Sequence, residues 1–376
     1  MRQKTLIALA IVTIPVLGLA IFLPSHRGDA LKQAETGPVF PTLKDWLAGA
    51  TKLTVTAAGG KSVTLTRTPP AQPAAGETVP LSGWGLAEKS NYPVQESLLR
   101  PVLNGLLALH TTEPKTEKKA LYDRIDVDDP TASKDSKAKL LELDNASGAS
   151  ILKLIIGRRK FDALAGGGDA IYIRKPDEER SWLAQPAFDL PTDAMGWVDH
   201  KILDVDADKI KSITLTAGSD KPLVLERAKP EDKLAIRDLA KDATTRSETP
   251  GSDVAAGFRY LDMLDVRPAA QVTGTPSGTA EIVTFDGLDL TVSIFNQPEG
   301  GPWLEVAAKG EGDEAKPAEE ITNRTKGWAY KVPPSREKLL ETKLADLLTP
   351  VVKPAETPAP AAGAPPKPPQ SKPAGK

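Results

Sequence analysis

The sequence contains the same fifteen-residue pattern twice. Leu53 to Arg67 reads LTVTAAGGKSVTLTR and aligns without a gap on Ile213 to Arg227, which reads ITLTAGSDKPLVLER. In both stretches apolar and polar residues alternate on either side of a turn that contains glycine, which is the pattern of a β-hairpin. A repeated unit constrains the fold strongly, because the flanking chain must build a similar arrangement around each copy.

The elements predicted after each hairpin come in a matching order. Helical spacing of apolar residues predicts a helix over 94–109 in the first copy and one over 254–266 in the second. Period-2 patterns then predict four strands in each copy, followed by a closing segment. The first copy has strands at Lys139–Asp144, Ile151–Ile156, Ala170–Arg174 and Ser181–Ala184 and closes at Trp197–Val205; the second has strands at Glu281–Asp286, Leu290–Phe295, Trp303–Ala307 and Gly327–Val332 and closes at Lys338–Leu348.

This order predicts an α+β fold of two tandem repeated units, 51–205 and 206–349, after one N-terminal transmembrane helix. Each unit is expected to be an antiparallel sheet with a covering helix. A further helix over 231–245, started by Lys229-Pro230, is expected only in the second unit. A length of 376 residues is enough for two domains, each with its own core. The alternative to a true repeat is that the two fifteen-residue stretches are similar by chance.

The chain begins with one apolar run, Thr5 to Leu23, which contains no charged residue. As a helix it would be about 28 Å long, which matches the hydrocarbon thickness of a bilayer. The basic residues before it favour a cytoplasmic N-terminus. We therefore predict a single-pass membrane anchor over 1–23 in a bacterial inner membrane, with the bulk of the chain periplasmic. Cleavage after Gly28-Asp29-Ala30, which would release a soluble periplasmic protein, is the alternative.

Two segments of the chain are expected to lie outside the folded units. Residues 24–50 are predicted to be a tether. Residues 350–376 consist almost wholly of Pro, Ala, Lys and Gly without apolar periodicity, so we predict a disordered tail. Its simplest role is solubility, and a strand that docks on a proline-recognising partner is the alternative.

Composition excludes several functions. The 48 basic and 50 acidic residues are interspersed and give a net charge of −2, so nucleic acid is not an expected partner. The absence of cysteine excludes disulfides, thiolate metal sites and a cysteine nucleophile.

Two acidic clusters and one glycine-rich stretch are the candidate ligand sites. Asp204, Asp206 and Asp208 have the spacing that begins a calcium loop, but Lys209 and Leu215 stand where the loop needs glycine and glutamate, so a solvated linker is expected. The residues at 126–129 are expected to form a turn. The basic run 157–160 and the glycines at 166–168 lie between predicted strands and favour a hairpin connection, with contact to acidic polymer or lipid head groups as the alternative.

No catalytic constellation is predicted. The three histidines, His26, His110 and His200, are not in a recognisable nucleophile or zinc motif. We therefore expect no enzyme, no cofactor, no metal and no catalytic residue. The tryptophans at 84, 182, 197, 303 and 328 are expected to be core or edge residues.

These motifs, in their order, resemble a bacterial family known only as a domain of unknown function. The residues that carry the resemblance are LTVTAAGGKSVTLTR, LLALHTTEPKT, LYDRIDVDDP, KLLELD, LIIGRR and the long stretch from AIYIRKPDEERSWLAQPAFDLPTD to AMGWVDHKILDV. Members of that family look like anchored, exported proteins that are often encoded beside ABC transporter components of the gliding-motility type. The resemblance implies an accessory or scaffold protein with a protein partner in the cell envelope. A binding module for an envelope polymer or small solute, and an unrecognised hydrolase, are the alternatives.

Overall fold

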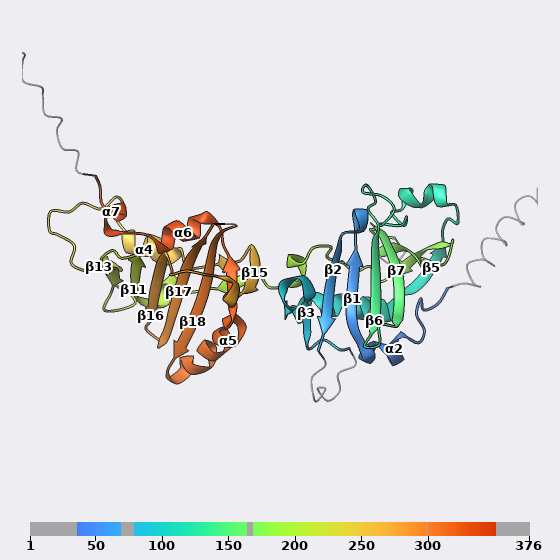
Figure 1. The fold of residues 1–376 in the computed structure, drawn as a ribbon, viewed down its shortest axis with the longest axis horizontal. Helices are drawn as coiled ribbons and strands as arrows, with labels where there is room; N and C mark the ends of the chain where they lie inside the picture. Colours follow the sequence, from blue (N-terminus) through green and yellow to red (C-terminus); the bar gives the residue numbers. More distant parts are fainter. Residues whose placement is uncertain (1–35, 69–78, 164–167, 299, 351–376) are drawn as a thin grey trace, which may run out of the picture.

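The computed structural model describes residues 36–68, 79–163, 168–298 and 300–350, which form two lobes side by side along the long axis of the molecule (Figure 1). The predicted anchor over 5–23, the tether up to residue 35 and the tail beyond Pro350 lie outside the described residues. Within the described ranges, no helix has the length and apolar character needed to cross a membrane.

The first lobe is built on a nine-stranded antiparallel sheet. Its strand order is β4-β3-β2-β1-β6-β7-β8-β9-β5. The strands are β1 (Ala50–Thr56), β2 (Ser62–Arg67), β3 (Trp84–Leu86), β4 (Tyr92–Pro93), β5 (His110–Pro114), β6 (Lys139–Asn145), β7 (Ser150–Lys160), β8 (Ala170–Arg174) and β9 (Ser181–Gln185).

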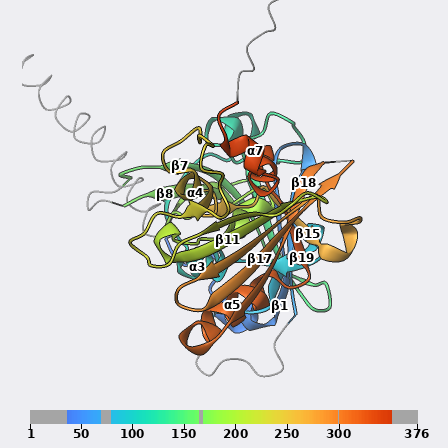
Figure 2. The same cartoon turned by 90° about the vertical axis from the view of Figure 1, so that its left-hand side faces the viewer.

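The second lobe is built on an eight-stranded antiparallel sheet, whose twist is visible when the molecule is viewed along its long axis (Figure 2). Its strand order is β13-β12-β11-β16-β17-β18-β19-β15. The strands are β11 (Ile210–Ala217), β12 (Leu223–Glu226), β13 (Ala235–Ile236), β15 (Asp265–Pro268), β16 (Gly278–Thr284), β17 (Leu288–Gln297), β18 (Gly301–Gly310) and β19 (Trp328–Lys331). A separate two-stranded ladder pairs β10 (Lys201–Leu203) with β14 (Leu261–Asp262).

The two large sheets have the same topology. Counting outward from the central hairpin, every strand of the second sheet has a counterpart in the first, and only β4 of the first sheet lacks one. Both predicted hairpins are confirmed as antiparallel pairs, and their core-facing residues lie directly opposite one another. These cross-strand pairs are Leu53 with Leu65, Val55 with Val63, Ile213 with Leu225 and Leu215 with Leu223.

Helices are few and mostly short. Among the described residues the longest helix, α3, covers residues where a helix is predicted, whereas α5 lies between β18 and β19 and is not predicted. The α-helices are α2 (Leu43–Trp46), α3 (Glu96–Ala108), α4 (Pro250–Ala256), α5 (Ala315–Thr325), α6 (Pro334–Leu340) and α7 (Leu344–Leu347); short 3₁₀ turns lie at 47–49, 58–60, 87–89, 119–124, 195–197, 207–209, 269–271 and 312–314.

The predicted α+β class is wrong, because the described chain is mostly β-sheet. Two of the helices on which that class depended do not form as expected. In the stretch 254–266, Phe258 and Leu261 are buried but Leu264 is 56% exposed, so the helical spacing does not continue. Tyr260 has a φ of 54°, a value that ends a right-handed helix, and the chain beyond it forms β14 and β15.

The predicted helix over 231–245 is also wrong. Leu234 and Ile236 are buried, whereas Lys233, Ala235 and Arg237 between and beside them are exposed. This is the period of a strand, and the segment adds β13 to the edge of β12. Asp238 then turns the chain with a φ of 59°.

The lobes meet where β4 packs against β19, and Figure 1 labels β3 and β15 on the two sides of this junction. The ring of Tyr92 meets the ring of Trp328 edge-on, with centroids 4.9 Å apart, and that of Tyr330 at 6.3 Å. Lys89 Nζ lies 2.5 Å from Asp265 Oδ1. Most buried apolar residues of the two lobes form one continuous cluster, so the sheets are joined by packing as well as by the connecting chain. A small second cluster of Tyr122, Val127, Ala138 and Ile155 lies in the first lobe.

The chain that connects the lobes is itself ordered. Trp197 is fully buried, and β10 pairs with β14 of the second lobe. Arg324 Nη2 in α5 donates to the carbonyl of Ile202 at 2.7 Å. These contacts hold residues 197–203, which follow the first sheet in sequence, against the second lobe.

We predict that Tyr92→Ala lowers the free energy of unfolding by about 3 kcal/mol, because it leaves a cavity beneath two aromatic rings at the junction. Urea denaturation of the full-length protein measures this change. Tyr260→Ala is the matched control, since the Tyr260 side chain is exposed and its loss should cost less than about 0.5 kcal/mol. Equal costs for the two variants would contradict the packing role of Tyr92.

Candidate functional site

Helix α3 buries one side against the first sheet and leaves an uncharged stripe on the other. Ser97, Pro101, Asn104 and Ala108 follow one another at spacings of four and three residues, and all are exposed. On the opposite side, the helix buries Leu99, Val102, Leu103, Gly105 and Leu106. An exposed helical stripe without a charged residue is available for contact with another chain.

The segment 186–191 runs beside this stripe. Phe188 and Leu190 are buried, whereas Pro186 and Asp189 face solvent. The helix accommodates the segment at Gly105, where an added Cβ would lie 2.5 Å from Phe188 Cδ1 and 2.8 Å from its Cγ. The absence of a side chain at this position therefore allows the segment to approach the helix closely.

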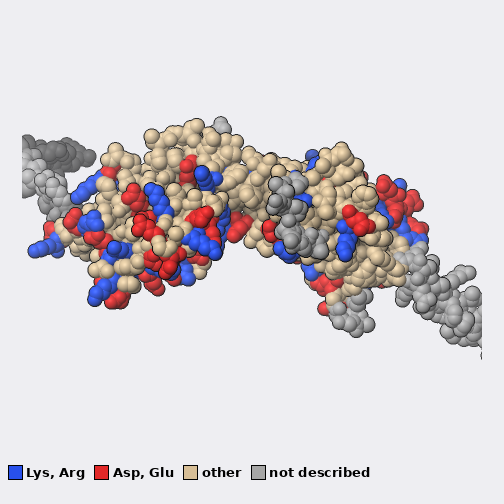
Figure 3. All heavy atoms as spheres, turned by 90° about the horizontal axis from the view of Figure 1, so that it is seen from below, with Lys and Arg blue, Asp and Glu red and all other residues tan. Residues whose placement is uncertain are grey.

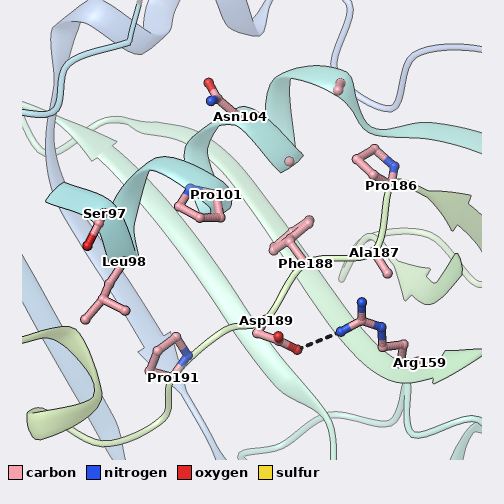
Figure 4. A pocket seen from close by; sticks show the side chains of 12 residues that line it. Ser97, Leu98, Pro101, Asn104, Arg159, Pro186, Ala187, Phe188, Asp189 and Pro191 are labelled. Atoms are coloured by element: carbon pink, nitrogen blue, oxygen red, sulfur yellow. Dashed lines mark hydrogen bonds and ion pairs between the residues drawn. The ribbon is translucent and has the colours of Figure 1, made fainter. Parts of the chain in front are cut away.

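A groove lies between the stripe and the segment. One hollow has a volume of about 550 Å³ and is open to solvent, and Figure 4 shows Pro101 and Asn104 on the helix and Phe188 and Ala187 on the neighbouring segment. A second hollow of about 590 Å³ continues past Ala108 and Pro186. We call the two together the α3 groove. Its lining residues are Ser97, Leu98, Pro101, Asn104, Gly105, Ala108, His110, Arg159, Gly168, Asp169, Gln185, Pro186, Ala187, Phe188, Asp189 and Pro191.

The charges in the α3 groove are paired with one another. Arg159 Nη1 donates to Asp189 Oδ1 at 3.1 Å, the contact drawn in Figure 4, and Arg159 Nε donates to Asp169 Oδ2 at 2.8 Å. Beside the groove, Lys139 Nζ donates to the carbonyl of Leu190 at 2.8 Å. Burial lowers the pKa of Lys139, although the charge of Asp189 opposes that shift. These contacts hold the segment 186–191 in place and leave the rest of the groove apolar.

The groove also presents polar groups that can bind a peptide backbone. Pro101 has no N–H, so the carbonyl of Ser97 lacks its usual donor four residues along the helix. The side chains of Asn104 and Gln185 add amide donors and acceptors at opposite walls. An apolar groove with a few such groups suits recognition of an extended segment.

The geometry gives no support to a reaction in the groove. His110 is the one histidine in its lining, and its ring Nδ1 contacts the carbonyl of Ala108 at 3.1 Å rather than a carboxylate or hydroxyl. In the part of the chain that the structure describes, no three His, Asp or Glu side chains gather as a metal site would require.

Comparison with known families finds a match over residues 84–273 to the family described as domain of unknown function DUF4340. The chain belongs to this family. The matched stretch runs from β3 across the junction into the second lobe, so this DUF4340 chain carries the whole α3 groove within it. Searches of the curated proteins and of the solved structures find no match.

The aspartates at 204, 206 and 208 lie in the connection between the lobes. Asp206 accepts from the backbone N–H of Asp208, as the cap of a short 3₁₀ turn, and Asp204 lies 4.0 Å from Lys201. Asp204 and Asp206 border a separate hollow of about 350 Å³, where Lys209 pairs with Asp286 at 2.8 Å. This pairing lowers the pKa of Asp286, chiefly through the hydrogen bond from Lys209. Two of the carboxylates around this hollow are therefore paired with lysines, Asp204 with Lys201 and Asp286 with Lys209.

The other sequence candidates are mostly engaged in structural contacts. In the basic run, Arg158 pairs with Asp126 at 3.0 Å and Arg159 pairs across the α3 groove, so two of the three cations are neutralised. His200 Nε2 contacts the carbonyl of Met195 at 2.9 Å. His26, Gly166 and Gly167 lie outside the described residues. Of the five tryptophans considered, those at 84, 197 and 303 are buried and those at 182 and 328 are partly buried.

Sequence analysis did not identify the α3 groove. The available signal was the stripe itself, because the exposed side of a surface helix normally carries charged residues, and on this helix the charged pair Glu96 and Arg100 lies beside four uncharged exposed residues, Ser97, Pro101, Asn104 and Ala108. The opposite wall gave no signal, since nothing in the sequence places 186–191 next to α3.

We predict that Gly105→Val destabilises the protein by about 1–3 kcal/mol, because its side chain would overlap the Phe188 ring and push the segment 186–191 outward. Thermal or urea denaturation measures the change. Gly49→Val is the control, since nothing lies within 4 Å of a Cβ at that position. If the two variants unfold alike, the close approach of helix and segment is not what shapes the groove.

Proposed function

We propose that this chain is a non-enzymatic accessory or scaffold protein that holds a partner protein of the cell envelope through the α3 groove. The observation that carries the proposal is the groove itself, whose apolar lining and paired charges suit an extended, uncharged segment of another protein. Membership of the DUF4340 family supports it, because the matched residues include the whole groove.

The setting proposed for this function is the periplasmic face of a bacterial inner membrane. The apolar run 5–23 supports an anchor, and the positive residues before it support a cytoplasmic N-terminus. With the anchor retained, the two lobes would be held near the membrane, where a transporter complex of the ABC type is the proposed partner. Cleavage near Ala30 would instead release the same lobes into the periplasm.

The distribution of charged side chains on the surface favours a protein partner over a nucleic acid. On the face shown in Figure 3, cationic and anionic side chains are interspersed over both lobes, and uncharged areas separate them. Nucleic-acid binding depends on a concentrated positive surface, because the phosphate backbone dominates its affinity.

We predict that Ala108→Lys reduces recovery of the envelope partner at least about tenfold when the full-length protein is captured from bacterial membranes. Ala108 is exposed and borders both hollows, so a lysine would place a charge in the apolar groove without disturbing the core. Quantitative mass spectrometry of the captured proteins measures the change.

Leu264→Lys is the matched control, because Leu264 is 56% exposed and lies in the second lobe. Both variants should keep the melting temperature of the parent protein. Undiminished recovery of the same partner by Ala108→Lys would refute a role for the groove. Recovery of a glycan without any protein would refute the scaffold proposal itself.

A further inference from the structure

A cluster of donor groups without partners lies on the second sheet, away from the α3 groove. Arg267 in β15 lies over Trp303 in β18, with its guanidinium carbon 3.9 Å from the centroid of the ring. Arg267 Nε and Nη2 and Trp303 Nε1 are buried, yet none of them has a hydrogen-bond partner. Trp303 as a whole is only 6% exposed.

Lys331 adds a second cation to the cluster. In the ladder between β15 and β19, Lys331 stands opposite Asp265, but the Asp265 carboxylate lies against Lys89 of the first lobe instead. A Cβ placed on Gly300 would lie 3.9 Å from both Lys331 Nζ and Trp303 Nε1, so these two nitrogens converge on the same turn. No carboxylate among the described residues forms an ion pair with Lys331.

Other stacked arginines of this chain show that the lack of partners is unusual. Arg174 lies over Tyr122 and donates from Nε to the carbonyl of Val127 at 3.0 Å and from Nη1 to three further carbonyls. Arg227 lies over Phe285 and donates from three nitrogens to backbone carbonyls within 2.9 Å. In both cases, backbone carbonyls accept hydrogen bonds from the guanidinium group. No carbonyl accepts a hydrogen bond from Arg267 Nε or Nη2.

Leaving these donors unpaired is unfavourable, because a buried polar group without a partner loses its hydration and gains nothing in return. A guanidinium that lies flat on an indole, next to an ammonium, presents a planar set of donors that matches two oxygens of one anion. Burial also lowers the pKa of Arg267, and the charge of Asp265 opposes that shift only in part.

We propose that Arg267, Lys331 and the indole N–H of Trp303 form a binding site for a small oxyanion, namely a carboxylate or phosphate group. The surrounding charges favour this ligand, because the Asp265 carboxylate lies against Lys89 and no carboxylate of the described residues forms an ion pair with Arg267 or Lys331. Glu305, two residues along β18 from Trp303, forms no ion pair with either cation, and burial raises its pKa. The site is independent of the α3 groove and goes beyond the proposed scaffold function.

The test follows the indole N–H resonance of Trp303 in the full-length protein while inorganic phosphate or acetate is added. We expect a saturable shift of this resonance with at least one of the two anions. Arg267→Gln should weaken binding about tenfold or more, because it removes a charge-assisted pair of hydrogen bonds. Lys331→Gln should weaken it in the same direction.

Two further variants distinguish binding at this site from a general effect of net charge and from an effect of unfolding. Trp303→Phe keeps a ring beneath Arg267 but removes the N–H, so binding measured by calorimetry should weaken. Lys309→Gln removes an exposed cation elsewhere on β18 and should bind as the parent does. Lys331→Gln and Lys309→Gln should retain the parent melting temperature within the range of a surface substitution. Trp303→Phe removes buried ring atoms and should lower the melting temperature, so its binding is measured well below its own unfolding transition.

Vesicles containing phosphatidylglycerol, compared with phosphatidylcholine vesicles, distinguish a lipid head group from a free anion. Binding to the anionic vesicles that is lost in Arg267→Gln identifies the head group as the source, and binding to phosphate or acetate alone identifies a soluble one. The proposal is overturned if neither anion gives a saturable shift, or if Arg267→Gln and Lys309→Gln bind equally well. These outcomes leave partner capture through the α3 groove unaffected.

Discussion

The alternating burial of the two central hairpins is the constraint on which the rest of the structure depends. In each hairpin the apolar residues of one strand lie directly opposite those of the other and face the core, so a shift of one residue would turn them all to solvent. The next strand on the open side, β6 or β16, pairs with the hairpin in the same way. The shared topology of the two sheets is built outward from these two registers.

The same constraint explains which parts of the fold could be predicted. The alternating strand β6 is predicted to within one residue of its observed bounds, because its apolar residues recur with the period of two that burial on one face of a sheet requires. The apolar run of β8 is also predicted at its observed bounds, although four of its five residues are buried and its burial does not alternate. The helix over 254–266 failed because three apolar residues at a spacing of three fit a helix equally well before burial is known. Leu264 is exposed, and its backbone N–H donates to the carbonyl of Lys331 in β19, while Tyr260 turns the chain with a positive φ. The short edge strands were missed, since two-residue pairings leave no periodic signal.

The sites were harder to predict than the strands, because each is assembled from residues far apart in the chain. The α3 groove requires a glycine in a helix to meet a phenylalanine 83 positions later, since Gly105 and Phe188 define its floor. The donor cluster requires Arg267, Trp303 and Lys331 to come from three strands that neighbour one another only in the folded sheet. Each of these residues has an ordinary role when read alone, and only the sheet order shows the combination.

The central claim is that the α3 groove is the surface that holds a partner. A photo-activated crosslinking amino acid in place of Asn104, which is exposed and lines the groove, tests this in living cells when compared with the same amino acid in place of Trp46, which is 62% exposed and outside the groove. The account predicts that irradiation joins the full-length protein to one envelope protein from position 104 and not from position 46. The same crosslinked product from both positions, or no product from position 104, would contradict it.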